Sequence, residues 1–132
     1  MTTTVIVMAA LSLAGCSVDP ASSVYDGEQT DADRIPDFVM SDGNAENYDL
    51  DSSRFLGTAK GREFYAVRSV EMGHCIATVV AEPVDWHIVC SPSGEMRFSG
   101  SGVQGRYFPG GYPEDSAEDG WISVHPSLRI QE

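Results

Sequence analysis

The feature that most constrains the fold of this chain is the position of Cys75 and Cys90 within two short apolar runs whose residues alternate as in β-strands. If the two cysteines face each other in an antiparallel hairpin, one register brings four further apolar side chains to the same face, because side chains alternate along a strand. A slip of one residue would turn that set toward solvent. The opposed pairs in this register are Cys75 with Cys90, Ala77 with Ile88, and Val79 with Trp86.

A bond between Cys75 and Cys90 would close a loop of about 15 residues, which the chain-entropy model values at about 3 kcal/mol. A redox-active pair is the alternative. Its usual Cys-x-x-Cys spacing is absent, and neither cysteine opens a predicted helix that would lower a thiolate pKa. Exported proteins keep such bonds. The hairpin therefore predicts a structural disulfide.

The rest of residues 53–132 has the same pattern of short runs rich in branched and aromatic residues. No stretch of ten or more residues has the helical period. We therefore expect an all-β domain, a small disulfide-stapled antiparallel meander or barrel. Its turns are expected at Lys60-Gly61, Met72-Gly73, Glu82-Pro83 and Ser93-Gly94. Its predicted strands are 54–58, 62–70, 75–81, 86–91, 95–99, 103–108, 121–124 and 128–130.

The N-terminus predicts where this domain is located. An apolar run over 5–13 is too short to cross a bilayer core of about 30 Å as a helix, and it ends in Leu13-Ala14-Gly15-Cys16. This ending resembles the lipobox of bacterial lipoprotein precursors. The resemblance implies a signal peptide over 1–15, cleavage between Gly15 and Cys16, and acyl chains such as palmitate on Cys16. It places the protein on the outer side of the cell membrane.

Two other interpretations of the N-terminus stay open, an uncleaved signal anchor and an ordinary apolar segment that ends in a buried cysteine. The first five residues contain no Lys or Arg, which departs from the usual start of a signal peptide.

The net charge of −12 disfavours nucleic acid and anionic lipid heads as direct partners, because both would be repelled. Ten acidic residues lie between residues 17 and 52 against the single base Arg34. Few aliphatic residues accompany them, so we expect a lipidated, mobile acidic tether over 16–52. Its one apolar patch, 35–40, either docks on the domain or a partner, or is only part of the linker.

Metal and catalytic signatures are weak. The segment from Asp42 to Asp49 alternates oxygen ligands as calcium loops do, but Asn47 takes the place of the required glycine and Ser53 that of the terminal glutamate. The three histidines lack metal-ligand spacing and are expected to be exposed strand residues. No Gly-x-Ser-x-Gly elbow is present. We therefore predict no catalytic residue, no cofactor and no metal. The histidines are His74, His87 and His125.

One glycine-rich segment is the best candidate for a binding surface. Several glycines between 100 and 111 interleave with aromatic residues, and rings offer apolar area with polar edges to a sugar or peptide. Arg106 is the only base within this run. The alternative is that the glycines only serve turns. The candidate residues are Arg106, Tyr107, Phe108 and Tyr112.

Several short motifs of the domain resemble small uncharacterised envelope proteins of actinobacteria over about residues 52–130. The resemblance implies a membrane anchor and an acidic stalk before a Cys-bearing β domain, and it implies no known activity. We expect a lipid-anchored, non-enzymatic surface protein that contacts an envelope protein or glycan. The alternatives are a small-ligand or cation-binding lipoprotein and, with less support, an enzyme. The motifs are Ser53-Arg54-Phe55-Leu56-Gly57, Gly61, Phe64-Tyr65-Ala66-Val67, Cys75-Ile76, Cys90 and Gly120-Trp121.

Overall fold

Eight β-strands form most of the computed structural model, which describes residues 24–93, 95–112 and 119–132. Each predicted strand overlaps one of them, so the all-β prediction is confirmed. The strands are β1 (Asp49–Ala59), β2 (Arg62–Ser69), β3 (Gly73–Ala81), β4 (Val84–Ser91), β5 (Met96–Gly100), β6 (Val103–Tyr107), β7 (Trp121–His125) and β8 (Leu128–Gln131).

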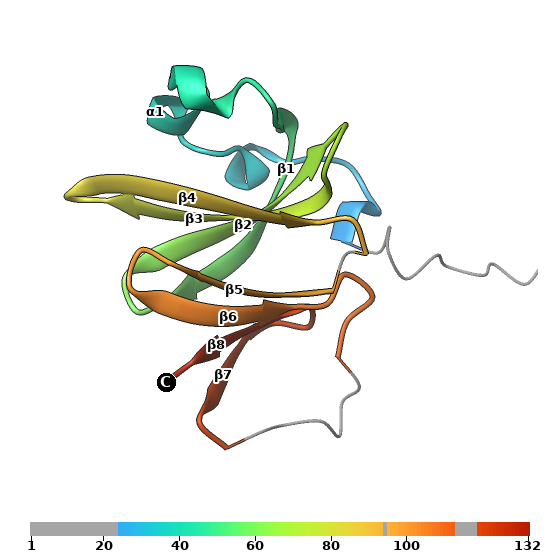
Figure 1. Ribbon diagram of the computed structural model, residues 1–132, viewed down its shortest axis with the longest axis vertical. Helices are drawn as coiled ribbons and strands as arrows, with labels where there is room; N and C mark the ends of the chain where they lie inside the picture. Colours follow the sequence, from blue (N-terminus) through green and yellow to red (C-terminus); the bar gives the residue numbers. More distant parts are fainter. Residues whose placement is uncertain (1–23, 94, 113–118) are drawn as a thin grey trace, which may run out of the picture.

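The strands form two antiparallel sheets, which lie one above the other in Figure 1. The first sheet has the order β1-β2-β3-β4, the simple meander that the short turns predict. The second has the order β5-β6-β8-β7. After β6 the chain goes to the far edge of this sheet and returns through Pro126 and Ser127 into β8. The second sheet is therefore not a simple meander.

The main core lies between the two sheets, and both contribute to it. Glycines allow the sheet edges to meet. A Cβ on Gly57 of β1 would lie 2.6 Å from Cγ1 of Val124 in β7, and a Cβ on Gly100 of β5 would lie 2.3 Å from the ring of His87 in β4. The buried core residues are Leu56, Phe64, Ala66 and Ile76 from the first sheet, and Met96, Phe98, Val103, Tyr107, Leu128 and Ile130 from the second.

The β3–β4 hairpin has the predicted register, and a disulfide joins Cys75 to Cys90. Ala77 lies opposite Ile88, and Val79 lies opposite Trp86, as expected. These six side chains belong to a second apolar cluster and not to the core between the sheets. The first sheet is therefore apolar on both faces, because alternate residues of β3 such as Ile76 point into the main core.

Residues 29–48, which we call the N-terminal cover, shield the outer face of the first sheet (Figure 1). They include the helix α1 (Asp37–Met40) and 3₁₀ turns at Asp31–Asp33 and Gly43–Ala45. Ile35, Val39 and Ala45 are each at most 3% exposed and pack against the disulfide hairpin. The apolar patch 35–40 thus docks on the domain. The prediction of a mobile tether is wrong for residues 24–52, while residues 16–23 lie outside the described part.

Hydrogen bonds hold the N-terminal cover at both edges of the first sheet. At β1, the buried Ser53 hydroxyl donates to the Asp33 carbonyl at 2.7 Å and accepts the Ile35 amide at 3.1 Å. At β4, the indole nitrogen of Trp86 donates to Asp42 at 2.9 Å. The tether prediction rested on many charges and few aliphatic residues, but those few aliphatic residues are enough to hold the segment on the sheet. Most of the carboxylates point to solvent, while a few apolar side chains insert beneath them.

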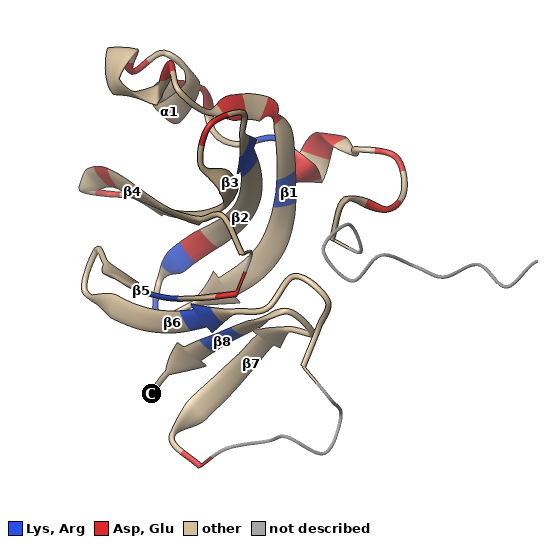
Figure 2. Ribbon diagram, turned by 45° about the vertical axis from the view of Figure 1, so that its right-hand side comes forward, with Lys and Arg blue, Asp and Glu red and all other residues tan. Residues whose placement is uncertain are grey.

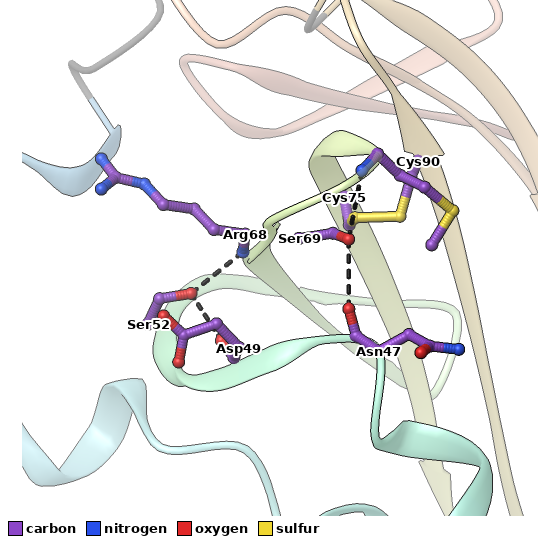
Figure 3. Close-up of a disulfide and its surroundings, with 8 residues drawn as sticks. Asn47, Asp49, Ser52, Arg68, Ser69, Cys75 and Cys90 are labelled. Atoms are coloured by element: carbon purple, nitrogen blue, oxygen red, sulfur yellow. Dashed lines mark hydrogen bonds between the residues drawn. A yellow bond between two sulfur atoms is a disulfide. The ribbon is translucent and has the colours of Figure 1, made fainter.

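Serine hydroxyl groups form hydrogen bonds with backbone groups next to the disulfide, as Figure 3 shows. The pairing of β1 with β2 is irregular between Asp49 and Arg54. There the Ser52 hydroxyl accepts the Arg68 amide at 2.9 Å and donates to the Asp49 carbonyl at 2.6 Å. The Ser69 hydroxyl donates to the Asn47 carbonyl at 3.1 Å. These side chains replace the ladder bonds that the irregular strand does not make.

Candidate functional site

Three arginines form a row across the outer face of the second sheet. Arg97 of β5 is directly opposite Arg106 of β6, which is directly opposite Arg129 of β8. Figure 2 shows their positions side by side on the three strands. They point outward because alternate residues of the same strands, such as Phe98 and Tyr107, point into the core. We call Arg97, Arg106 and Arg129 the arginine row.

The arginine row has an energetic cost. Adjacent strands lie about 4.8 Å apart, and like charges directly opposite each other on neighbouring strands destabilise a sheet. This repulsion occurs twice, between Arg97 and Arg106 and between Arg106 and Arg129. Packing of the core does not require it, because the inner faces of these strands supply the core residues. Arg106 and Arg129 have partners of their own in the protein that offset part of this cost, and the outward-facing row is a candidate binding surface.

Aromatic rings support two of the three guanidinium groups. Arg106 lies over the ring of Trp121 at 4.4 Å, and Arg129 lies over the ring of Tyr112 at 4.1 Å. The ring of Tyr112 in turn packs against Phe108, with 5.6 Å between the centroids. Such cation–π contacts contribute about 0.5–1 kcal/mol each at exposed sites and hold the planar groups in a defined orientation.

Exposure falls from one end of the arginine row to the other. Arg97 is exposed, Arg106 is half-buried, and Arg129 is only 7% exposed. Trp121 and Tyr112 are half-buried as well. A ligand would therefore meet Arg97 first and Arg106 next, while Arg129 lies deeper in the sheet beneath its aromatic neighbour.

Two shallow, open hollows lie along β5, and both are lined by Arg97 and Arg106. The first, of about 450 Å³, is lined in addition by Ser93, Glu95, Met96 and Tyr112. The second, of about 620 Å³, includes Trp121 and the polar side chains of Ser99, Gln104 and Gln131. The first hollow thus combines two guanidinium groups with the carboxylate of Glu95 and the ring of Tyr112, and the second combines them with amide and hydroxyl groups and the ring of Trp121. This chemistry suits a polar ligand better than an apolar one.

The structure brings together only part of the surface that the sequence predicts. Arg106, Phe108 and Tyr112 lie at or next to the hollows. Tyr107 is a correction, because it is 0% exposed and belongs to the core between the sheets. Within the described residues its hydroxyl has no hydrogen-bond partner, and burial raises the pKa of Tyr107 far above its ordinary value. Neighbours in the sequence point to opposite faces of a strand, so Tyr107 cannot share a surface with Arg106.

Sequence reasoning missed Arg97 and Arg129, since Arg106 is the only base within the glycine-rich run. The signal for Arg97 was available. A hairpin that turns at Ser101-Gly102 between β5 and β6 sets Arg97 opposite Arg106. No comparable signal existed for Arg129, because its position depends on the insertion of β8 between β6 and β7.

The glycines of this region have structural roles, as the alternative prediction expected. Gly102 has a φ of 79° in the turn between β5 and β6. A Cβ on Gly105 would lie 2.2 Å from the ring of Phe98, so only glycine leaves room for that buried ring. The candidate surface therefore consists of arginines and aromatic rings, and these two glycines serve a turn and the packing of Phe98.

The histidines lie apart from the arginine row. His87 is exposed as expected, but His74 and His125 are half-buried, which corrects that expectation. Burial lowers the pKa of His125, and its Nδ1 accepts the Ser127 amide at 3.0 Å. Among the described residues, no three His, Cys, Asp or Glu side chains gather as metal ligands would.

The predicted calcium segment is part of the N-terminal cover. The carboxylate of Asp42 accepts the backbone amide of Asn44 at 3.0 Å and the indole of Trp86 at 2.9 Å, and these bonds lower the pKa of Asp42. Its oxygens thus join a 3₁₀ turn to β4. The role of this carboxylate in the structure is therefore to accept hydrogen bonds that hold the N-terminal cover in place.

Comparison of the chain with protein-family models, with curated proteins and with solved structures found no match. The predicted signal peptide, with Gly15 and Cys16, lies outside the described residues. In the part of the chain that the structure describes, no helix has the length and apolar character needed to span a bilayer. The fold and the site together define a two-sheet β domain with a disulfide on one side and an arginine row on the other.

Proposed function

We propose that this chain is a lipid-anchored protein of the cell envelope whose β domain is a non-catalytic binding module. The arginine row and its aromatic neighbours form the binding surface. The observation that carries the proposal is the in-register placement of Arg97, Arg106 and Arg129 on the outer face of the second sheet, beside the rings of Trp121 and Tyr112. Guanidinium groups stay protonated at neutral pH, so they bind and orient a ligand and do not exchange protons with it.

The anchor in this proposal rests on the resemblance of Leu13-Ala14-Gly15-Cys16 to a lipobox. Two acyl chains on Cys16 would hold the protein stably at the membrane, where one chain would not. Val24 packs against the main core of the domain, and it follows Cys16 by only eight residues. Eight residues span at most about 29 Å even when fully extended. The binding module would therefore stay close to the membrane surface, and it would reach ligands near the base of the cell wall.

The anchor is tested by growing cells that make the full chain with a fatty-acid analogue. We expect label on the protein and none on the Cys16→Ser variant. Binding is tested with the purified full chain in detergent micelles, mixed with detergent-washed cell walls that no longer contain a bilayer. Co-sedimentation with the walls then reports on the β domain alone.

We expect the protein to sediment with the walls, and the Arg97→Gln variant to bind at least ten-fold more weakly, because Arg97 is the most exposed member of the arginine row. Arg34→Gln is the matched control. It removes the same charge from the exposed N-terminal cover, where Arg34 forms a surface ion pair with Asp31 at 3.7 Å. Equal sedimentation of all three proteins would contradict the proposed surface.

A further inference from the structure

The first described residues of the chain are held at one end of the two-sheet stack. Val24 and the ring of Tyr25 pack against the main core. The guanidinium group of Arg68 lies over this ring at 4.0 Å from its centroid, and that of Arg54 lies 5.9 Å from it. Arg54 also donates to the carbonyl of Gly27 at 3.4 Å. These contacts fix the place at which the chain enters the domain.

The turn between β2 and β3, residues 70–72, lies at the same end of the stack. Arg68 is opposite His74 in the register of these strands, and the ring of His74 lies 6.5 Å from that of Tyr25. The turn between β3 and β4 lies at the other end, because consecutive antiparallel strands reverse direction (Figure 1). A strand rises about 3.3 Å per residue, so the nine residues of β3 separate the two turns by about 26 Å.

The tip of the β2–β3 turn presents an apolar side chain to solvent. Val70 is 96% exposed, the largest exposed fraction among the large apolar residues that the structure describes. Single exposed apolar side chains are common on protein surfaces, so this exposure alone identifies no partner. The place of Val70 is more informative, because it lies at the end of the domain where the chain from Cys16 enters.

The distance from the anchor decides which end of the domain can face the bilayer. In the proposed function Cys16 lies at the membrane surface, and eight residues lead from it to Val24. These residues span at most about 29 Å. With the β2–β3 turn toward the bilayer, a small part of this span is sufficient. With the β3–β4 turn toward the bilayer, they would have to cover the length of β3, about 26 Å, and give up most of their conformational freedom.

We infer that the β2–β3 end of the domain lies on the lipid bilayer that holds Cys16, with the side chain of Val70 in the membrane interface. This inference rests on the proposed function and adds to it a second membrane contact and the orientation of the domain. One valine buries too little apolar surface to bind a bilayer alone, but the acyl anchor keeps it at a high effective concentration. Exposed acidic residues at this end, such as Asp26 and Glu71, would be repelled by anionic lipids, so the contact should be strongest on zwitterionic lipid.

The test uses the lipidated full chain in phosphatidylcholine vesicles, with an environment-sensitive fluorophore on one added cysteine. Labelling is specific in the lipidated protein, because Cys75 and Cys90 are bonded to each other and Cys16 carries the acyl chains. The label is placed in turn at three exposed apolar positions, in the β2–β3 turn, at the start of β4 and on the N-terminal cover. The variants are Val70→Cys, Val84→Cys and Met40→Cys.

We expect spin-labelled lipid to quench the label at position 70 about two-fold or more strongly than the labels at positions 84 and 40. Equal or stronger quenching at position 84 or 40 of vesicle-bound protein would overturn the inference and leave the lipid anchor standing. If the full chain carries no lipid and does not bind vesicles, the proposed anchor fails and the inference fails with it. Without vesicles, a blue shift at position 70 of the Cys16→Ser protein that grows with protein concentration would assign Val70 to a contact between two copies and also overturn the inference.

Charged variants connect the membrane contact to Val70 itself. With the label moved to Glu71→Cys, the change Val70→Asp should remove most of the quenching, because a carboxylate is disfavoured in the membrane interface. Val84→Asp is the matched control. It adds the same charge at a 64% exposed valine at the other end of the domain, and it should leave the quenching unchanged. Equal quenching in both variants would contradict the role inferred for Val70.

Discussion

Single residues of this domain have roles that depend on the face of the strand they occupy. Arg106 and Tyr107 are neighbours in β6, yet one lines the proposed site and the other is completely buried. His125 at the end of β7 is half-buried, and its unprotonated Nδ1 accepts the backbone amide of Ser127 at 3.0 Å. Protonation of His125 in acid would place a charge in a half-buried position and would break this hydrogen bond. Both effects oppose it.

We predict that the stability of the protein depends on pH through His125. Burial lowers the pKa of His125 in the folded state below its ordinary value of about 6.5. The unfolded chain then binds the proton more readily, so stability is full above about pH 6.5 and declines as the pH falls toward the lowered folded pKa. Urea unfolding between pH 7.5 and 5 measures this decline.

The variant His125→Asn keeps a hydrogen-bond acceptor but does not titrate. Its stability should change less than that of the wild type between pH 6.5 and 5. The exposed His87 supplies the control, because His87→Asn should keep the wild-type decline. A decline of equal size in all three proteins would assign the pH dependence to another group.

At the scale of elements, the β3–β4 hairpin is the centre of the first sheet's outer cluster. Its disulfide joins two strands that are buried on one face by the main core and on the other by the N-terminal cover. Cys75 and Cys90 are separated by 15 positions in the sequence. The bond restricts the unfolded chain over this distance, and it lies on the sheet opposite to the arginine row.

We predict that the double variant Cys75→Ala/Cys90→Ala loses about 3 kcal/mol of unfolding free energy, the amount that the chain-entropy model gives for a loop of about 15 residues. Guanidinium unfolding of the variant, and of the wild type with and without reductant, measures it. Sedimentation with cell walls should not change under native conditions. A loss below 1 kcal/mol would show that the bond contributes little to this fold.

On the scale of the whole molecule, the protein is a stack of the N-terminal cover, the first sheet and the second sheet (Figure 1). The cover is a part of the fold, because Ile35 is 2% exposed and Val39 is completely buried on the first sheet. Its carboxylates give one side of the molecule a strong negative charge, while the arginine row lies on the other side (Figure 2).

We predict that Ile35→Ala destabilises the protein by about 2–5 kcal/mol, the usual cost of truncating a buried isoleucine. Met40→Ala is the matched control from the same cover. Met40 is 43% exposed, so its truncation should cost about 0.5 kcal/mol or less. Chemical denaturation of the full chain compares the two. Equal, small effects would mean that the cover does not contribute to the stability of the domain.

The sequence by itself determined the strands, their turns and the hairpin register. These features depend on neighbours along the chain. Residues alternate with period two, Lys60 and Gly61 adopt the positive φ angles that a tight reversal needs, and one register alone pairs Cys75 with Cys90 and keeps the apolar side chains together.

Only the tertiary structure decided the features that involve distant segments. The position of β8 between β6 and β7 sets Arg129 beside Arg106, and no local pattern specifies that position. The docking of residues 29–48 depends on an outer face of the first sheet that exists only after the hairpin has formed. Strands and turns can be predicted locally because the interactions that favour them are between residues close in the sequence. The arginine row and the N-terminal cover depend on contacts between distant segments, which form only in the folded state.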